Sequence, residues 1–216
     1  MKDPSFLVKD IEISFKKEYA ELANSEEQKM MQVFQRFFKD ERRVHDLKAI
    51  LYEAAMTIHR LFPFRETSIG IRYPSDGKYR YLVALGFSPA AREAHMKLEY
   101  THEEMFDRLK YPWIKVSDYI DFRYAEGEQF KQIGEEKSFT RPSMLSLKRD
   151  SPRQMLEGDY FDIYFTDEKG NVIGWIEVAA PKEGTIPPLR MIRWLELFAL
   201  MLSPIIENEL RNWKPV

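Results

Sequence analysis

Two carboxylates and three aromatic rings stand at alternate positions in two segments of the C-terminal third of the sequence. Tyr160, Asp162 and Tyr164 occur in the first segment, and Trp175 and Glu177 occur in the second. Because successive side chains of a strand point to opposite faces, each set shares one face of a strand. A pair of carboxyl groups in a dry site can act as general acid and general base. Aromatic walls with a few polar groups are instead typical of a small-molecule site.

A more ordinary role is open for each of these side chains. The carboxylates of Asp162 and Glu177 can cap loops or pair with nearby arginines, since ion-paired carboxylates are common in structural networks. We favour this structural role over acid and base catalysis. The rings of Tyr160, Tyr164 and Trp175 can form core beneath loops, so the sequence leaves both a ligand pocket and a filled interior open.

The two segments are expected to form a β-hairpin that positions these groups. Segments 159–165 and 172–179 alternate in character like strands, and 166–171 carries turn residues. A four-residue loop at 167–170 gives the hairpin one wholly apolar face. The predicted pairs on that face are Phe165 with Val172, Ile163 with Gly174 and Phe161 with Ile176.

A strongly apolar helix is predicted after the hairpin, over residues 189–208. Pro187 and Pro188 precede it, and proline fits the first turn of a helix, where its missing N–H leaves no bond unmade. A helix that is apolar on two sides needs two partners. We expect the sheet to cover one stripe, and a second copy of the chain or another helix of the same chain to cover the other. The first stripe is Leu189, Ile192, Leu195, Phe198, Leu202 and Ile206, and the second is Trp194, Leu197, Met201 and Ile205.

Composition removes several kinds of function. The 216 residues contain no cysteine, which excludes disulfides, thiolate metal sites and chemistry at sulfur. A net charge of −2 provides no basic surface for nucleic acid or for a membrane. His95 and His102 are too far apart along the chain to hold one metal ion together. No Gly-x-Ser-x-Gly motif and no glycine-rich phosphate loop is present, and the sequence leaves any cofactor unknown.

The sequence also predicts where the protein resides. The N-terminus lacks the features of a secretory signal, and the longest apolar run, 197–206, is too short to span a bilayer. The absence of cysteine fits a reducing interior. We therefore expect a cytoplasmic protein that does not enter a membrane.

Helical patterns fill the N-terminal part of the chain. A short helix is predicted over 11–23, and Ser25 with Gln28 has the spacing of a capping box for the next helix. Apolar residues then recur at steps of three and four from Met30 to Leu61, which predicts one long helix.

We divide the chain into a helical extension, residues 1–43, and a main domain, residues 44–216. In the extension, Met30, Phe34 and Phe37 have no core of their own to cover, so they need a partner. The first strands of the main domain are expected at 67–73 and 78–85, with a turn between them. Further elements are a helix of about a dozen residues after Ser88 and a strand over 112–116.

Several C-terminal sequence motifs resemble those of a known family. The sequence Gly170-Asn-Val-Ile-Gly-Trp-Ile-Glu-Val178, followed by Pro181, Pro187-Pro188, Leu195-Glu-Leu-Phe-Ala199 and Ile205-Ile-Glu-Asn208, is similar to the C-terminal half of a GAF domain. Tyr81-Leu-Val-Ala-Leu-Gly86 resembles the second strand of that family. The resemblance implies an α+β fold, with terminal helices on one face of an antiparallel sheet and loops and short helices on the other.

The resemblance also implies a small-molecule pocket beneath those loops. In a GAF domain the interval 117–154 would form the roof of the pocket, and function tends to lie in loops over a rigid sheet. Arg123, Tyr124, Phe139 and Arg141 could then close the pocket over the hairpin. The expected ligand-binding residues are Tyr160, Asp162, Tyr164, Trp175, Glu177, Arg123 and Arg141.

The expected function is a non-catalytic sensory or regulatory module that binds a small molecule and forms a homodimer through its helices. A signal would then pass to a separate signalling protein. One alternative is an assembly module whose pocket is filled by its own side chains, and another is a small enzyme that uses the acidic face. GAF-type methionine sulfoxide reductases act through cysteine, so the sequence excludes that enzyme.

Overall fold

The computed structural model describes residues 4–23, 25–41, 46–124 and 134–213. The chain divides into two compact units, Met1–Arg42 and Arg43–Val216. The predicted boundary between residues 43 and 44 lies outside the described residues. None of the described helices is long and apolar enough to cross a membrane.

The described part of the N-terminal unit consists of α1 (Pro4–Leu22) and α2 (Glu26–Glu41). Because proline is tolerated in the first turn of a helix, α1 begins at Pro4, well before the predicted start at residue 11. The Ser25 hydroxyl accepts a hydrogen bond from the backbone N–H of Gln28 at 3.1 Å, as the capping spacing predicts. The Gln28 side chain donates to the Tyr19 hydroxyl at 3.4 Å instead of reaching back to residue 25.

The prediction of one long helix through residue 61 is wrong. The helix α2 ends at Glu41, and α3 (Leu47–Leu61) begins with its own N-cap. The Asp46 carboxylate accepts a hydrogen bond from the backbone N–H of Lys48 at 3.0 Å. An aspartate at this position satisfies an N–H group that has no partner within the helix, so it favours a new helix start.

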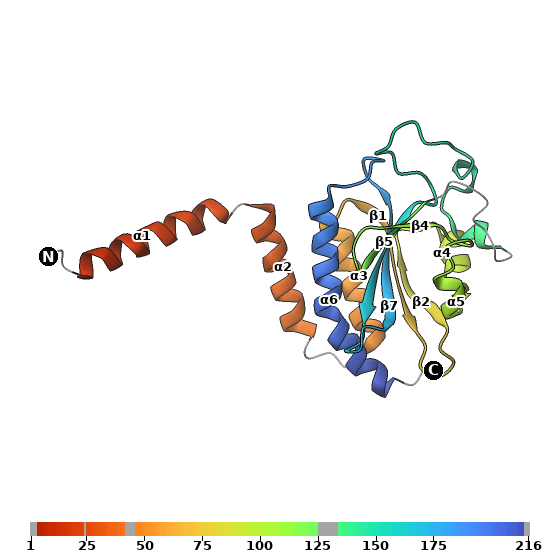
Figure 1. Cartoon of the computed structure of the whole chain (residues 1–216), viewed down its shortest axis with the longest axis horizontal. Helices are drawn as coiled ribbons and strands as arrows, with labels where there is room; N and C mark the ends of the chain where they lie inside the picture. The colour runs from red at the N-terminus through yellow and green to blue at the C-terminus, as the bar shows by residue number, and fades with distance from the viewer. Residues whose placement is uncertain (1–3, 24, 42–45, 125–133, 214–216) are drawn as a thin grey trace. The chain divides into compact units, whose positions relative to one another are not determined.

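Seven strands form one antiparallel sheet within the described residues, in the order β3-β2-β1-β7-β6-β5-β4 (Figure 1). The predicted α+β class with an antiparallel sheet is therefore confirmed. Two strands, β3 and β5, have no counterpart in the sequence-based expectation. The strands are β1 (Phe64–Arg72), β2 (Tyr79–Leu85), β3 (Glu99–Tyr100), β4 (Trp113–Lys115), β5 (Ile120–Arg123), β6 (Tyr160–Thr166) and β7 (Val172–Pro181).

The predicted hairpin exists as β6 and β7, but its register differs by two residues. The pairs are Phe161 with Val178, Ile163 with Ile176 and Phe165 with Gly174. The turn is longer than predicted because the Asp167 carboxylate accepts hydrogen bonds from the backbone N–H groups of Lys169, at 2.9 Å, and Asn171, at 2.8 Å. A shift of two residues keeps every side chain on its face, so the apolar and polar faces are as predicted.

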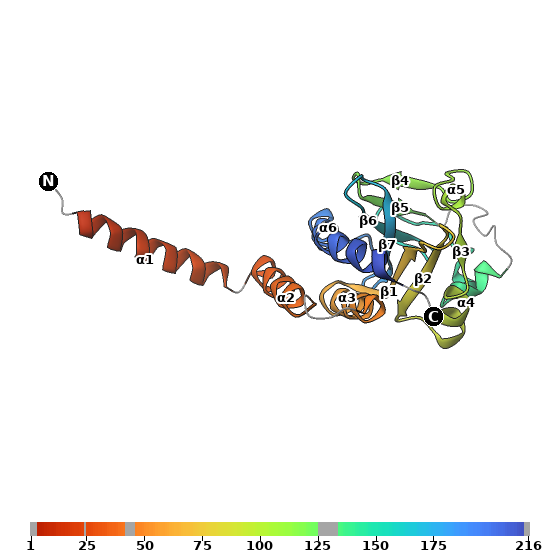
Figure 2. The same cartoon turned by 90° about the horizontal axis from the view of Figure 1, so that it is seen from below.

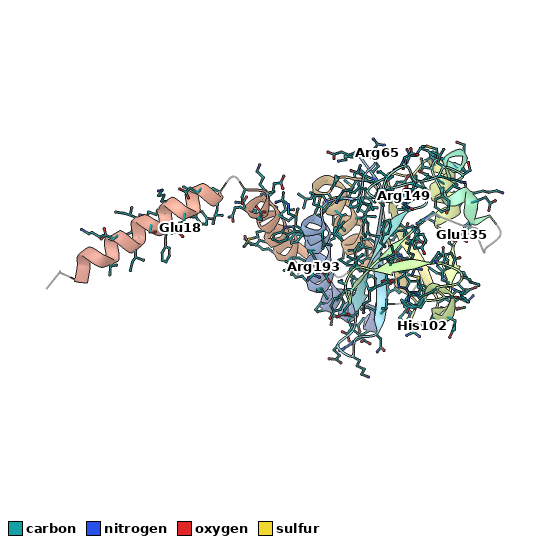
Figure 3. All side chains as sticks on the ribbon, turned by 45° about the horizontal axis from the view of Figure 1, so that its top comes forward. Glu18, Arg65, His102, Glu135, Arg149 and Arg193 are labelled. Atoms are coloured by element: carbon teal, nitrogen blue, oxygen red, sulfur yellow. The ribbon has the colours of Figure 1, made fainter. Side chains whose placement is uncertain are left out.

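Helices cover the two faces of the sheet differently (Figures 1 and 2). The long helices α3 and α6 (Leu189–Asn212) lie on the apolar face. The short helices α4 (Pro89–His95), α5 (His102–Met105), η1 (Glu135–Ser138) and η2 (Pro142–Met144) belong to the opposite side. Accordingly, Arg193 on α6 and Glu135 on η1 lie on opposite sides of the sheet (Figure 3).

The two apolar stripes of α6 have different environments. Five of the six residues of the predicted first stripe are at most 1% exposed, namely Ile192, Leu195, Phe198, Leu202 and Ile206. The sixth, Leu189, stands at the first position of the helix and is 59% exposed. In the second stripe, Leu197 and Met201 are each 43% exposed. The first stripe therefore belongs to the core, and the second reaches the surface.

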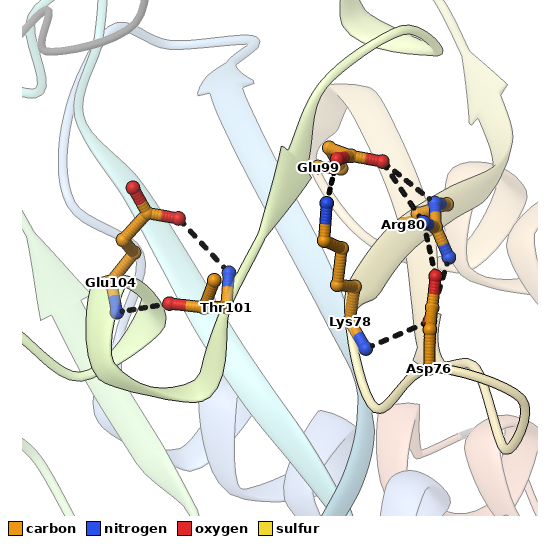
Figure 4. Close-up of polar contacts among 6 residues, drawn as sticks. All are labelled: Asp76, Lys78, Arg80, Glu99, Thr101 and Glu104. Carbon is orange, nitrogen blue, oxygen red and sulfur yellow. Dashed lines mark hydrogen bonds and ion pairs between the residues drawn. The ribbon is translucent and has the colours of Figure 1, made fainter.

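The polar side of the sheet is closed at its edge by short elements. The helix predicted after Ser88 is shorter than expected, because α4 ends at His95 and the chain then forms β3, in which Glu99 pairs with Arg80. The Arg80 guanidinium donates to the carboxylates of Glu99 and Asp76, and Lys78 also pairs with Glu99 (Figure 4). These contacts fix β3 to the end of β2.

The helix α5 follows β3 directly and carries a capping box. The Thr101 hydroxyl accepts from the backbone N–H of Glu104 at 3.2 Å, and the Glu104 carboxylate accepts from the backbone N–H of Thr101 at 3.0 Å (Figure 4). Both donors would otherwise lack a partner at the helix start. This helix holds Met105 and its neighbours over the polar face.

Candidate functional site

The polar face of the hairpin lies at the centre of the sheet. Asp162 on β6 stands directly opposite Glu177 on β7, and Tyr164 stands opposite Trp175. On the other side of β7, Ser68 of β1 is the partner of Glu177. The predicted carboxylate pair is thus a cross-strand pair, held by two rigid strands.

Trp175 packs among aromatic rings of β2. Its ring centroid lies 4.9 Å from that of Tyr81 and 6.0 Å from that of Tyr79, both in edge-on arrangements. Gly70 is the cross-strand partner of Trp175, and a Cβ atom at residue 70 would overlap the six-membered ring of the indole. The sequence left open whether these rings form core or a pocket wall, and the indole does contribute to an aromatic core.

A small inner cavity of about 10 Å³ remains on this face, which is room for about one water molecule. Two buried polar atoms in its walls, Asp162 Oδ1 and the indole Nε1 of Trp175, have no hydrogen-bond partner within the described residues. Both residues line the cavity, so one acceptor and one donor without a partner belong to its walls. Its walls are Tyr81, Tyr100, Met105, Tyr111, Arg123, Tyr160, Asp162, Trp175 and Glu177.

The second oxygen of Asp162 is held in a buried ion pair. Arg123 Nε lies 2.5 Å from Asp162 Oδ2, and the two side chains are 4% and 2% exposed. The guanidinium also donates to the carbonyl oxygen of Met105 at 2.8 Å and to that of Tyr111 at 3.4 Å. Burial raises the pKa of Asp162 to about 6, although Arg123 opposes that shift. At neutral pH the pair is ionised and ties the short elements over the sheet to β6.

Two predicted site residues do not line either cavity. The Tyr164 hydroxyl donates to Asp121 Oδ2 at 2.9 Å, beside Arg123, and the ring belongs to the aromatic core. Arg141 instead pairs with Glu157, a residue of the outer cavity, and its Nη2 atom lies 2.7 Å from Glu157 Oε2. Of the residues predicted to close the pocket, Arg123 lines the inner cavity and Phe139 lines the outer one. Tyr124 lines neither cavity.

An outer cavity of about 40 Å³ adjoins the inner one, and the two share Tyr81, Tyr100, Tyr160 and Glu177. Its other walls come from β1, α4, η1 and the chain before β6. The acidic side chains that line it are Glu66, Glu135, Glu157, Asp159 and Glu177, and the rings are Tyr81, Phe87, Tyr100, Phe139 and Tyr160, together with His95. The two cavities are therefore acidic and aromatic.

Glu177 stands where the two cavities meet. The Tyr81 hydroxyl donates to its Oε2 at 2.6 Å, and His95 Nε2 lies 4.0 Å from its Oε1. Burial, with a smaller contribution from Asp162, raises the pKa of Glu177 to about 8. Burial also lowers the pKa of His95 to about 3, and His95 Nε2 lies 3.1 Å from the Ser68 hydroxyl. At neutral pH, Glu177 is therefore mostly protonated and His95 is uncharged.

Three other carboxylates of the outer cavity have partners. Glu157 pairs with Arg141, and Arg149 Nη2 lies 3.0 Å from Asp159 Oδ2. Glu135 accepts from the hydroxyl of Tyr111 at 3.1 Å and from that of Tyr100 at 3.4 Å. Within the described residues, no group of three or more His, Asp or Glu side chains could hold a metal ion.

Sequence reasoning missed the contributions of β2, β3 and α4 to the site. Tyr79 and Tyr81 alternate along β2 just as the hairpin residues do, so this spacing could have placed Tyr81 on the polar face. His95 and Tyr100 come from a short helix and a two-residue strand. No local pattern in the sequence indicates that these two side chains face Glu177.

No protein-family model matches the sequence, and no curated protein matches it. Solved structures are similar at low sequence identity. The GAF domain of an Acinetobacter phosphoenolpyruvate-protein phosphotransferase is 12% identical, with a TM-score of 0.54 over 86% of this chain and 97% of that one. Free methionine-R-sulfoxide reductase from Neisseria meningitidis is 10% identical, with a TM-score of 0.53 over 85% and 92% of the two chains.

A third structure extends the comparison to a larger protein. A bacteriophytochrome from R. palustris is 10% identical, with a TM-score of 0.52 over 84% of this chain and 38% of that one. At such identities the similarity concerns the fold alone, and it agrees with the family that the C-terminal motifs resemble. The chain therefore has a GAF-like fold.

Proposed function

We propose that this chain is a non-catalytic sensory or regulatory module that binds a small molecule in the two cavities on the polar face of its sheet. The observation that carries this proposal is the pair of unpartnered buried atoms, Asp162 Oδ1 and Trp175 Nε1. Buried polar atoms are nearly always hydrogen-bonded, and an exception in a cavity indicates that a partner belongs there. A ligand group, or a water held beneath a ligand, would supply that partner.

The fold and the chemistry of the walls support a regulatory role over an enzymatic one. Domains of the GAF family usually serve as sensory or regulatory modules, which is the role that the resemblance implies. Methionine sulfoxide reductases of this fold act through cysteine, and this chain has none. The carboxylate of Asp162 is paired with Arg123, so Asp162 is not free to act with Glu177 as an acid and base pair.

The proposal includes assembly and a partner. We propose a homodimer formed through the helices, because Leu197 and Met201 leave an apolar stripe of α6 at the surface. The signal would pass to a separate signalling protein, and the protein would act in the cytoplasm. We also propose that residues 1–43 form an extension to a GAF-like domain spanning 44–216.

The second candidate function is an assembly module whose cavity is filled by its own side chains. The small volumes of the two cavities, about 10 and 40 Å³, favour this reading. Small-molecule sites are more often several hundred Å³ in size. A ligand of the proposed kind must therefore be small, or the loops over the sheet must move to admit it.

Native mass spectrometry of freshly purified full-length protein separates the two candidates. A bound small molecule should appear as added mass in the parent protein. The variant Trp175→Phe keeps a ring and removes the indole N–H, so it should retain less ligand. Because it also removes atoms from the aromatic core, its folding is checked by thermal melting. Trp175→Ala should lose the ligand altogether.

Trp213→Ala is the matched control for these variants. Trp213 packs against Tyr73 and lines neither cavity. This control should retain the ligand as the parent does. Protein that carries no added mass in any preparation would contradict the ligand-binding proposal and favour the assembly module.

A further inference from the structure

We propose that the group that reaches the sheet is a small organic cation, which pairs with Glu177 and displaces a proton from it. This inference rests on the proposed function, because it specifies the ligand of the same cavities. The proton leaves the carboxyl group for solvent as the carboxylate and the cation form an ion pair. Net charge is therefore conserved when one cation enters and one proton departs.

The charges of the cavity walls favour a cation. Each of three carboxylates is matched by one arginine: Asp162 by Arg123, Glu157 by Arg141 and Asp159 by Arg149. Within the described residues, neither Glu66 nor Glu177 has a lysine or arginine at ion-pair distance. Among the described residues that line the two cavities, an anionic ligand would meet carboxylates and only arginine that is already paired with one.

The aromatic walls of the two cavities also favour a cation. The rings of Tyr81, Tyr100 and Tyr160 line both cavities, and Phe87 and Phe139 line the outer one. The faces of aromatic rings attract organic cations, and cages of several rings recognise ammonium groups. The hydroxyl of Tyr81 is donated to Glu177, and the His95 ring lies 3.8 Å from the Tyr81 ring, so the rings of Tyr100, Tyr160 and Phe139 are the ones expected to meet the cation.

The surroundings of Glu177 explain why a cation would release a proton. The charged and titratable groups around it are Asp162 and Tyr160 on β6, Glu66 on β1, Tyr81 on β2, Tyr100 on β3, His95 on α4 and Arg123 on β5. Burial and the neighbouring carboxylates raise the pKa of Glu177 to about 8, while His95 is held neutral. A cation beside the carboxylate would lower the pKa of Glu177, since an opposite charge within a few ångströms favours the ionised form.

A definite pH dependence follows from this linkage. Below about pH 7 each bound cation should release close to one proton, and above about pH 9 it should release almost none. The apparent affinity should therefore increase with pH, by about a hundredfold between pH 6 and pH 9, and then level off.

The experiment uses two probes of nearly equal shape. Methylguanidinium remains charged across this pH range, and N-methylurea is its neutral counterpart. Isothermal titration calorimetry of the full-length chain at pH 6.5, in two buffers of different ionisation enthalpy, measures the number of protons released. A repeat at pH 9 measures the change in affinity. We expect methylguanidinium to bind with proton release at pH 6.5, and N-methylurea not to bind.

Glu177→Gln preserves the size of the side chain and removes its charge. It should weaken methylguanidinium binding at least tenfold at pH 9 and abolish proton release, with folding checked by thermal melting. The control Glu103→Gln changes an exposed carboxylate on α5 that lines neither cavity, and it should bind as the parent does.

Three outcomes overturn the inference: affinity for methylguanidinium that is independent of pH, unchanged affinity in Glu177→Gln, or no binding of the cation at all. Binding of N-methylurea without the cation leaves the proposed function standing with a neutral ligand. The proposed function itself fails only if native mass spectrometry also finds no small molecule on the protein.

Discussion

The two faces of the β6–β7 hairpin are built from alternate residues of the same strands, yet their surroundings differ completely. The long helices cover the apolar face, on which Phe161, Ile163 and Ile176 are at most 3% exposed. On the polar face, Asp162 and Glu177 are almost as deeply buried, at 2% and 7% exposed. Burial is thus similar on the two faces, and only the chemistry of the buried atoms differs.

Buried apolar and buried polar atoms contribute differently to the stability of the domain. Apolar burial stabilises a domain by about 25 cal/mol per Å², whereas a buried polar atom without a partner destabilises it. Of the four unpartnered buried atoms of the described residues, Asp162 Oδ1 and Trp175 Nε1 lie on the polar face of this hairpin, whereas Thr67 Oγ1, whose strand partner is Val178, and His59 Nδ1 lie on the side of the long helices. Only the two polar-face atoms belong to residues that line the inner cavity, so of these four they are the ones that a ligand there could satisfy.

The largest expected loss of stability comes from placing a charge on the apolar face. Ile176→Asp buries an unpaired carboxylate against α6 and should lower the free energy of unfolding by about 4–5 kcal/mol, as measured by chemical denaturation. Ile176→Val is the control, with an expected loss of about 1 kcal/mol. An Ile176→Asp variant that is as stable as the parent would mean that this face does not pack as described.

The next largest loss of stability is expected when the buried ion pair of Arg123 and Asp162 is broken. Arg123→Met leaves Asp162 buried without its partner and should lower the free energy of unfolding by about 3–4 kcal/mol. The double variant Arg123→Met/Asp162→Leu removes both charges and should recover most of that loss, since matched apolar residues can replace a buried pair. Losses that simply add in the double variant would show that the two charges are not coupled.

The pH dependence of stability tests the state of Glu177. Because its folded pKa, about 8, lies above the ordinary value of 4.5, the folded state binds more protons between these values. The contribution of Glu177 to stability is therefore complete below pH 4.5 and is lost as the pH rises through 8. Glu177→Gln should remove this slope and be more stable than the parent at pH 9 by about 2–3 kcal/mol.

His95 provides the opposite slope and an internal control. Its folded pKa, about 3, lies below the ordinary value of 6.5, so its contribution is complete above pH 6.5 and is lost as the pH falls through 3. Glu177→Gln should leave this acid limb unchanged. Equal slopes in parent and variant between pH 5 and pH 8 would show that Glu177 is ionised in the folded protein.

The sequence predicts the faces of the hairpin better than its register, and the reason is physical. Alternation has a period of two, so a shift of two residues leaves Asp162 and Glu177 on the same face. The shift itself depends on how the Asp167 side chain binds the turn, which the alternation does not encode. Face assignment is therefore a stronger prediction than strand pairing.

The candidate site was harder to predict because most of its walls come from distant short segments. Arg123 stands on β5, a strand of four residues, and meets Asp162 only because the sheet places β5 beside β6. His95 and Tyr100 reach the site from elements that are too short to show a periodic pattern. Sequence patterns alone thus predict the central strands of the site and not its outer walls.

The smallest expected effect on folding, and the clearest on assembly, concerns the second stripe of α6. Leu197 and Met201 are each 43% exposed, so replacing both with lysine should change the free energy of unfolding by no more than about 0.5 kcal/mol. If the stripe forms the interface of a homodimer, the same change removes apolar area from the contact and places like charges opposite each other across a two-fold axis.

Sedimentation equilibrium at micromolar concentration should then give twice the chain mass for the parent and the mass of one chain for the variant. Leu109→Lys, which alters a residue that is 93% exposed and lies outside α6, is the control and should leave the dimer intact. A parent protein that sediments as a single chain at every concentration would contradict the dimer and leave this stripe as an ordinary exposed surface.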